Sequence, residues 1–587
     1  MSKTSHRVRL SKALIDVALG QKAADRVIVN AQLLNVYTAE VLDGYDVAIK
    51  DGWIAYVGPD SRHTIGPETD VIDAQGQAVI PGFIDGHTHM AWLYTAAEFL
   101  KHAIPGGTTT IITETLEPYP VAGYKGLLDF LDSLRDQPVK IFATVPPMVS
   151  TSSAAEGIPL AELEKLMERR DVLGLGETYW QAALQRPDTF LPAFDTVLSH
   201  RKKLEGHSAG ASEKKLNAYV ATGISSCHEP IKPGEVRDRL RLGLHVMVRE
   251  GSIRRDLETI AAIKDYGIDF RRLILASDGI EPGALLDKGY MEYIVQKAID
   301  CGFDPVAAVQ MVTLNVAEHF NLDHLIGGIA PGRWADLLIV PDLRTIRPEY
   351  VVSKGEVVAC KGRLLVATRP HAFAPASRQT IHLSEDLRPE AFALPLDTVQ
   401  AEITVRVIEM LTDLVTRELK VNLPVVDGQV RVDTHQDYVK VAAIDRTHNP
   451  GQTCVGLIKG FGIKQGALAC SAAWDTSDIL VVGAEEADMA LAVNRIKALQ
   501  GGAVVCQGGC VMAELPLPIF GIMSDLPLNQ LAGQLHIVNR AAAELGVSFP
   551  DPMLSLIALS GAAIPFFRIC EQGLVNLKDG RTYDPIM

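Results

Sequence analysis

Eight short apolar runs typical of β-strands recur between residues 78 and 276, and segments with helical spacing separate most of them. The runs are 78–84, 108–113, 139–145, 172–175, 203–206, 223–226, 244–248 and 273–276. This rhythm is typical of a closed (β/α)8 barrel, but it also fits an open, doubly wound sheet. The polar residues that follow the runs distinguish the two folds.

Five of the eight runs end in residue types that bind metal ions. These ends are Asp85-Gly86-His87-Thr88-His89, Glu177, His207, Cys227-His228-Glu229 and Ser277-Asp278. In a barrel all the carboxyl ends of the strands converge on one face, whereas an open sheet spreads them along an edge. We therefore predict an α/β fold, a (β/α)8 TIM-like barrel, with the active site at that face.

The predicted metal ligands are His87, His89, Glu177, His207, His228 and Asp278. Residues two apart in a strand point the same way, so His87 and His89 are expected to bind one cation. Glu177 can bridge two cations with its two oxygens, and the other two histidines complete the second site. Two such cations polarise a bridging water to hydroxide, and Asp278 is the expected base that relays the proton. Each residue alone is more typical of packing or capping, so the prediction depends on their joint placement.

Strand-rich segments flank this alternating stretch. Residues 26–81 read as short strands with a hairpin signal at Asp51-Gly52, and a similar pattern returns after residue 327. We predict a small β-sandwich from residues 1–81 with 326–375, into which a metal-dependent hydrolase barrel of residues 82–325 is inserted. A Pro/Ala-rich stretch, 371–376, predicts a linker to a third, C-terminal α/β unit of residues 376–587.

The composition limits the partners of the chain. Lys and Arg number 56 against 71 Asp and Glu, and the net charge of −15 repels nucleic-acid phosphates. No apolar run reaches the roughly 18 residues of a membrane span, and the first ten residues lack the core of a signal peptide. The eight cysteines form no CxxC pair, which indicates buried, reduced thiols. We expect a cytoplasmic protein with a small-molecule substrate and no membrane or nucleic-acid partner.

The ordered residues from Asp85 to Asp278 resemble those of the amidohydrolase superfamily. Residues 79–89 are similar to its barrel entry, and residues 327–337 to its return into the small sandwich. Along nearly its whole length the chain is most similar to bacterial adenine deaminases. The C-terminal segments 459–464, 489–495 and 514–518 resemble the extra domain that marks that family, and generic amidohydrolases lack it.

The resemblance implies hydrolysis of adenine to hypoxanthine and ammonia at a centre of two divalent cations, Mn²⁺ or Fe²⁺, with Zn²⁺ also compatible. It implies the same six ligands, a purine substrate and a homodimer or larger homo-oligomer. We predict Asp278, Glu177 and Glu229 as catalytic residues, and Arg249, Glu250 and Ser252 as substrate contacts. For Glu229 and the three substrate contacts, a structural salt bridge or cap is an equally good explanation.

Two segments depart from the family pattern. The family carries Asp-Pro-His-Glu after strand two, where this chain has residues 113–119, TETLEPY. It carries Ala-His-Asp-Ser-His-Asn in the C-terminal unit, where residues 473–478 read AWDTSD. Because small pocket changes move specificity far, an N6-substituted adenine stays an alternative substrate.

Two further alternatives concern the function class. A cyclic-amide hydrolase usually holds a lysine after strand four, where Glu177 stands, and this difference argues against that class. A non-catalytic scaffold with the same shell typically loses ligands, whereas this chain keeps all six.

Overall fold

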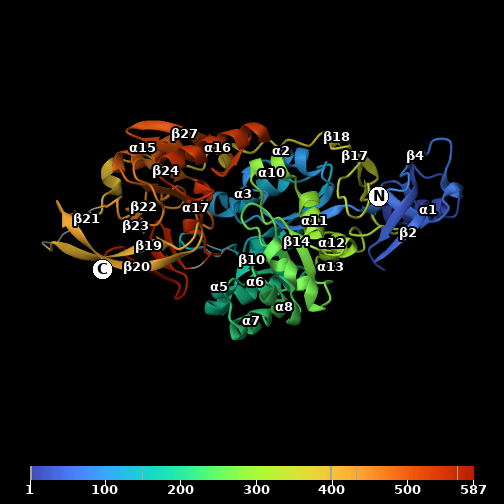
Figure 1. Cartoon of the computed structure of the whole chain (residues 1–587), viewed down its shortest axis with the longest axis horizontal. Helices are drawn as coiled ribbons and strands as arrows, with labels where there is room; N and C mark the ends of the chain where they lie inside the picture. The colour runs from blue at the N-terminus through green and yellow to red at the C-terminus, as the bar shows by residue number, and fades with distance from the viewer. Residues whose placement is uncertain (1–2, 148–149, 156, 397–399, 431, 565) are drawn as a thin grey trace.

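The computed structural model describes residues 3–147, 150–155, 157–396, 400–430, 432–564 and 566–587. Figure 1 shows the N-terminal strands (blue) at one end, the α/β segment (cyan to green) in the centre and the C-terminal unit (orange to red) at the other end. Within the described ranges, no helix is long and apolar enough to cross a membrane.

The chain segments before and after the central segment together form one nine-stranded sheet. This sheet stands where the small sandwich was predicted. Strand β5 joins the two segments, because it pairs in parallel with β1 and antiparallel with β15. The strands are β1 (Arg26–Asn35), β2 (Glu40–Lys50), β3 (Trp53–Gly58), β4 (Asp70–Asp73), β5 (Ala78–Pro81), β15 (Leu337–Val340), β16 (Tyr350–Ser353), β17 (Glu356–Cys360) and β18 (Arg363–Leu364). Helix α1 (Lys3–Ala18) packs against β2 and β3.

The predicted hairpin between β2 and β3 is confirmed. Lys50 pairs with Trp53, and the two residues between them, Asp51 and Gly52, both have positive φ, at 51° and 81°. Two successive left-handed residues characterise the type I′ turn that an Asp-Gly pair favours.

The central segment forms eight parallel strands, in sheets of five and three. They are β6 (Phe83–Thr88), β8 (Thr108–Thr113), β9 (Lys140–Val145), β10 (Val172–Tyr179) and β11 (Lys203–His207), then β12 (Ser226–Cys227), β13 (His245–Arg249) and β14 (Leu273–Ala276). Backbone hydrogen bonds join the two sheets on both sides. The Ser225 amide donates to the Leu204 carbonyl at 2.9 Å, and the Asp278 amide donates to the His87 carbonyl at 3.0 Å. These bonds close the curled sheets into the TIM-like barrel.

The first predicted run, 78–84, was wrong as one barrel strand. It contains β5, which belongs to the small sheet, and the start of β6, which belongs to the barrel. The division falls at Gly82, where an added Cβ would lie 2.4 Å from the Thr109 side chain. An apolar run gives no sign of such a change of sheet, because both strands are buried.

Helices surround the barrel and lead from one strand to the next. They are α2 (Ala96–Ala103), α3 (Pro118–Ser133), α4 (Leu160–Met167), α5 (Trp180–Gln185), α6 (Pro187–Ser199), α7 (Glu213–Val220), α8 (Pro233–Arg241), α9 (Leu257–Ile260), α10 (Pro282–Lys288), α11 (Met291–Asp300), α12 (Pro305–Gln310) and α13 (Leu314–His319). In α4, Leu163 and Leu166 are buried while the charged residues between them face outward. This pattern is the amphipathic spacing from which the sequence predicted a helix.

The C-terminal unit is built on a second nine-stranded sheet. Its strands are β19 (Glu402–Met410), β20 (Thr416–Val426), β21 (Gln429–Val430), β22 (Tyr438–Asp445), β23 (Thr453–Lys459), β24 (Ala467–Cys470), β25 (Asp478–Gly483), β26 (Gly502–Gln507) and β27 (Cys510–Pro516). Helices α15 (Glu486–Leu499), α16 (Leu528–Glu544) and α17 (Pro552–Ile557) pack on it, and β29 (Phe567–Cys570), β30 (Gly573–Asn576) and β31 (Arg581–Tyr583) form a small sheet.

The C-terminal unit packs closely against the barrel. Strand β28 (Met523–Ser524) pairs with β7 (Leu93–Tyr94), which follows the first barrel strand. One hydrophobic cluster includes residues of barrel strands and of the C-terminal sheet. Residues 371–376, the predicted linker, are held to α3, because Asp129 accepts from the Ala374 amide at 3.0 Å and pairs with His371 at 2.7 Å. The mouth of the barrel is therefore covered by the C-terminal unit.

Candidate active site

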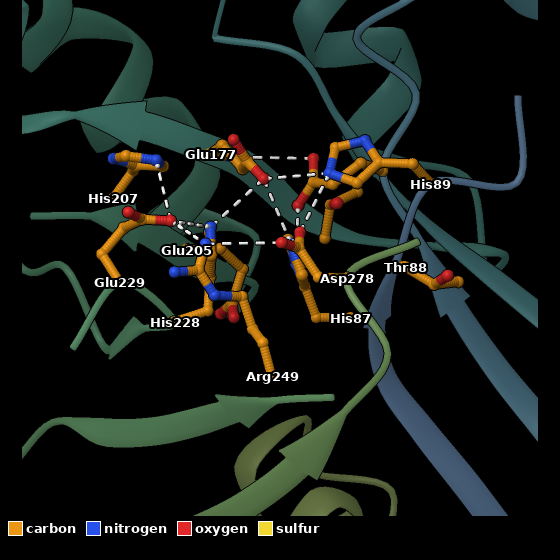
Figure 2. Close-up of polar contacts among 12 residues, drawn as sticks. His87, Thr88, His89, Glu177, Glu205, His207, His228, Glu229, Arg249 and Asp278 are labelled. Carbon is orange, nitrogen blue, oxygen red and sulfur yellow. Dashed lines mark hydrogen bonds and ion pairs between the residues drawn. The ribbon is translucent and has the colours of Figure 1, made fainter. Parts of the chain in front are cut away.

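The six predicted metal ligands come together at the carboxyl ends of five barrel strands. Figure 2 shows the side chains of His87, His89, Glu177, His228 and Asp278 converging, with His207 and Glu229 beside them. All six are less than 10% exposed. Residues separated by up to 191 positions meet here because parallel strands present their ends to one face.

Glu177 lies at the centre of this cluster. Its Oε1 is 3.1 Å from His89 Nε2, 3.2 Å from His87 Nε2 and 3.3 Å from His228 Nε2. The Oδ1 of Asp278 lies 3.3 Å from His87 Nε2 and 3.5 Å from His89 Nε2. Three ring nitrogens thus face one carboxylate oxygen, an arrangement that a bound cation would satisfy better than hydrogen bonds can.

Two groups of side chains are close enough to hold a metal ion. One consists of His87, Glu177, His228 and Asp278, and the other of His207, His228 and Glu229; within each group the possible ligand atoms lie within 4.8 Å of one another. Among the described residues, the buried His87 Nε2 makes no hydrogen bond of normal geometry, although Glu177 Oε1 and Asp278 Oδ1 lie 3.2 and 3.3 Å away. A buried ring nitrogen without a partner is costly unless something binds it, so the donor set fits divalent cations.

Glu117 supports the cluster from the segment that departs from the family pattern. Its Oε1 lies 2.5 Å from Nδ1 of His89. A carboxylate on one ring nitrogen fixes the tautomer and leaves the other nitrogen free for a metal ion. Sequence reasoning missed this role, although an acidic residue after the second strand, on the ligand-bearing face, was an available signal.

Glu114 packs against the same strands. Its Oε1 is 3.6 Å from His87 Nδ1, and its Oε2 accepts from the Glu177 amide at 3.4 Å. Burial raises its pKa to about 7. This placement of the Glu114 side chain requires a glycine at position 176, because a Cβ there would lie 1.9 Å from Glu114 Oε2.

Asp85 belongs to the first motif but has a structural role. The Ser277 hydroxyl donates to its Oδ2 at 2.5 Å, and the Tyr290 hydroxyl donates to the same oxygen, which ties β6 to the end of β14. Burial raises the pKa of Asp85. Asp278, which follows Ser277 in the chain, has a φ of 63°. Such strained left-handed conformations are concentrated at functional sites.

Arg249 connects three carboxylates at the end of β13. It pairs with Glu229, lies 3.3 Å from Asp278 Oδ2 and 3.1 Å from Asp256 Oδ2. Burial opposes ionisation of Glu229, but the Arg249 charge outweighs it and holds the pKa of Glu229 well below its usual range. An ionised Glu229 suits a metal ligand or a proton acceptor, and does not suit a proton donor.

Glu250 and Ser252 lie outside the cavity lining, and their role as substrate contacts stays a prediction. Glu250 follows Arg249 in β-conformation, so its side chain points to the opposite side, where it accepts from Lys297 at 2.7 Å. The Ser252 hydroxyl accepts from the Glu281 amide at 2.9 Å. Neither residue lines the cavity over the ligands.

The cavity over the cluster has a volume of about 300 Å³. The barrel contributes the ligands and Arg249 to its lining. The C-terminal unit contributes a mostly apolar wall, which we call the C-terminal wall: Leu414, Val415, Trp474, Asp475, Ala563 and Ile564. Burial, with the nearby Glu177 charge, raises the pKa of Asp475 to about 7. Sequence reasoning assigned no site residue to this unit.

Comparisons with known proteins agree with this architecture. The amidohydrolase family model matches residues 78–363, and the model of the adenine deaminase C-terminal domain matches residues 413–581. An adenine deaminase of Moorella thermoacetica is 38% identical over 586 residues, 98% of each chain. One of Clostridium botulinum (strain Langeland) is 34% identical over 97% of this chain and 96% of its own, and one of Cenarchaeum symbiosum is 36% identical over 98% and 94%.

Proposed function

Because the chain belongs to the adenine deaminase family, we propose that it hydrolyses adenine to hypoxanthine and ammonia in the cavity between the barrel and the C-terminal unit. The observation that carries the proposal is the buried cluster of four histidines and three carboxylates in that cavity. The full-length similarity, which includes the C-terminal domain, favours adenine over other substrates of amidohydrolases.

We propose two divalent cations, Mn²⁺ or Fe²⁺, with Zn²⁺ also compatible with these donors. The proposed ligands are His87, His89, Glu177, His207, His228 and Asp278. The pair of cations would supply a hydroxide nucleophile at neutral pH. Two neighbouring groups of donor side chains support this proposal, and they share His228. The second group adds Glu229 to the six predicted ligands.

Asp278 is the proposed base. Burial opposes its ionisation, but the close His87 and His89 rings and the charge of Arg249 outweigh burial and hold its pKa well below the usual range. Asp278 is therefore ionised when substrate binds and can take the proton from the attacking water. It then passes that proton to the purine ring or the leaving amine, as a general acid–base residue does.

Arg249 and Glu177 position the reacting groups. Arg249 orients the second carboxylate oxygen of Asp278 and keeps Glu229 ionised. Glu177 lies between the histidines of the two donor groups, where a bridging carboxylate is expected. Both residues are buried, and in a cavity that excludes water their charges act more strongly than in solvent.

A second candidate substrate is an N6-substituted adenine. The C-terminal wall supports it, because most of its side chains, among them Leu414 and Ile564, are apolar and can pack against an alkyl substituent. In this case an alkylamine would leave in place of ammonia. The net charge of −15 suits a free base rather than a nucleic acid. A homo-oligomer and a cytoplasmic location stay predictions.

The test is an assay of the Mn²⁺- or Fe²⁺-loaded full chain with adenine and N6-methyladenine. Formation of hypoxanthine and ammonia from adenine is the expected result, and Asp278→Asn should abolish it. Asp287→Asn, an exposed aspartate of α10, is the control and should match the wild type. Methylamine release without adenine turnover would move the function to the second candidate. No product from either base, with two metals bound, would contradict the proposal.

A further inference from the structure

We propose that Asp475 of the C-terminal unit accepts the ring N–H of the bound purine and thereby restricts the enzyme to bases without an N9 substituent. This inference rests on the proposed deamination of adenine and names the group that recognises the free base. It also gives the C-terminal unit a direct part in substrate binding.

The structure holds Asp475 rigidly at the interface between the two units. It follows β24 in a loop of the C-terminal unit, is 5% exposed and has φ of 62°, which is in the left-handed region. Its backbone carbonyl accepts from the hydroxyl of Ser150, a residue of the barrel, at 2.6 Å. A strained conformation persists only where the surroundings fix it, and this contact provides such a constraint.

The carboxylate of Asp475 is fixed relative to the metal ligands by one side chain. The Tyr179 hydroxyl lies 3.1 Å from both oxygens, and the Ala562 amide donates to Oδ2 at 2.8 Å. Tyr179 lies two residues after Glu177 in β10, so both side chains point into the barrel mouth. Tyr179 also packs edge-on against His207, with ring centroids 5.0 Å apart.

This carboxylate retains capacity to accept a further hydrogen bond. Both oxygens of a carboxyl group can accept hydrogen bonds, and the protonated form keeps acceptor lone pairs beside its O–H. The Tyr179 hydroxyl has one proton and serves one oxygen at a time, so with the Ala562 amide two positions are used. Asp475 lines the cavity, so a donor on a bound ligand can reach the unused positions.

The other acidic side chains of the cavity are engaged elsewhere. Glu117 faces His89, and Glu229 faces Arg249 and two histidines. Glu235 is only half-buried and accepts from the Ile231 amide at 3.0 Å. Asp475 is thus the buried acid that the C-terminal unit contributes to the cavity.

The chemistry of a free purine fits this acceptor. Neutral adenine carries one ring N–H, on its five-membered ring, whereas adenosine and 9-methyladenine have none. Trp474, the neighbour of Asp475 in the lining, offers an aromatic face on which a flat base can stack. A site that accepts a hydrogen bond from a substrate N–H leaves its buried acceptor unpaired when an analogue without that N–H binds. The resulting ratio of kcat/KM values for substrate and analogue can reach about 10⁴ to 10⁵.

The experiment compares kcat/KM for adenine and 9-methyladenine in the metal-loaded full chain. The wild type should prefer adenine by at least about 10³-fold, and Asp475→Ala should reduce this preference to about tenfold or less. Asp475→Asn keeps an acceptor oxygen and should restore part of the preference. Asp427→Ala is the matched control, because Asp427 is an exposed left-handed residue of the same unit (φ 52°), and it should keep the wild-type ratio.

The outcomes separate this inference from the proposed function. Adenine turnover with an unchanged ratio in a metal-loaded, folded Asp475→Ala would overturn the inference alone. No turnover of adenine by the wild type would remove the proposed function and the inference with it. If Asp475→Ala does not fold, inhibition of the wild type decides: hypoxanthine should bind at least about tenfold more tightly than 9-methylhypoxanthine, and equal binding would overturn the inference.

Discussion

The two sides of the cavity are built in different ways. On the barrel side, the proposed metal ligands and Arg249 stand at the ends of strands, and each contacts at least one other charged group, with Glu177 in the middle. On the C-terminal wall, five of the six lining residues are apolar, and Asp475 is the single acid. The comparison indicates that the barrel supplies the chemistry, whereas the C-terminal unit supplies the shape and recognition of the substrate.

The largest expected effect lies on the barrel side. Asp278→Asn keeps the size of the side chain but removes the proton acceptor, so kcat should fall by about 10³-fold or more. Steady-state kinetics with adenine, at confirmed metal content, measure it. A variant that keeps more than a tenth of the wild-type kcat would show that another group accepts the proton.

A smaller effect is expected for the support of His89. Glu117→Gln removes the carboxylate at His89 Nδ1 and should weaken metal binding by about 10- to 100-fold. Titration with a competing chelator measures this affinity. Unchanged affinity would mean that Glu117 is a packing residue and that the barrel side is less interdependent than the contacts indicate.

Metal binding on this side should release protons. In the metal-free protein, burial opposes protonation of His87, but the Asp278 and Glu177 carboxylates outweigh it and raise its pKa to about 10. His87 is therefore protonated at pH 7, and a cation must displace that proton, so metal affinity should rise with pH up to about 10. Calorimetry in two buffers of different ionisation enthalpy counts the protons. Affinity that does not change between about pH 6 and pH 8 would contradict this reading.

Effects on the C-terminal wall should be milder and of a different kind. Ile564→Ala removes apolar contact surface from the substrate cavity but touches no ligand, so KM for adenine should rise by about three- to tenfold at nearly constant kcat. Initial rates over a range of adenine concentrations separate the two parameters. A fall in kcat comparable with that of Asp278→Asn would break the division between the two sides.

The smallest effect is expected for Glu250→Gln. Glu250 does not line the cavity, and its side chain pairs with Lys297. The change should leave kcat/KM within about twofold and lower the melting temperature slightly, because Lys297 loses its charged partner. A large loss of activity at normal metal content would restore Glu250 as a substrate contact.

The sequence could predict the barrel side because its information is local. A strand fixes which residues share a face, and the barrel fixes where all strand ends meet, so His87 and Asp278 could be placed together without coordinates. One error in the barrel also has a local cause, because the run 78–84 was counted as a single strand although the chain changes sheet at Gly82. The side on which Glu250 lies follows from the alternation along β13, which was not applied to it.

The C-terminal wall could not be predicted in this way. Asp475 reaches the cavity through a loop, and its placement depends on contacts with Ser150 and Tyr179, which lie about 300 residues earlier in the chain. No periodic pattern records such a contact between two units. The segment 473–478 did depart from the family pattern, and that departure was the available sign that the region bears on the substrate.

The division between chemistry and recognition is tested most directly by measuring kcat and KM for adenine in Asp278→Asn and Asp475→Ala side by side. The account predicts that Asp278→Asn lowers kcat by about 10³-fold with KM within about threefold of the wild type. It predicts that Asp475→Ala raises KM by about tenfold or more, with the smaller effect on kcat. If Asp475→Ala instead lowered kcat as far as Asp278→Asn at unchanged KM, the C-terminal unit would take part in the chemical step and the account would be wrong.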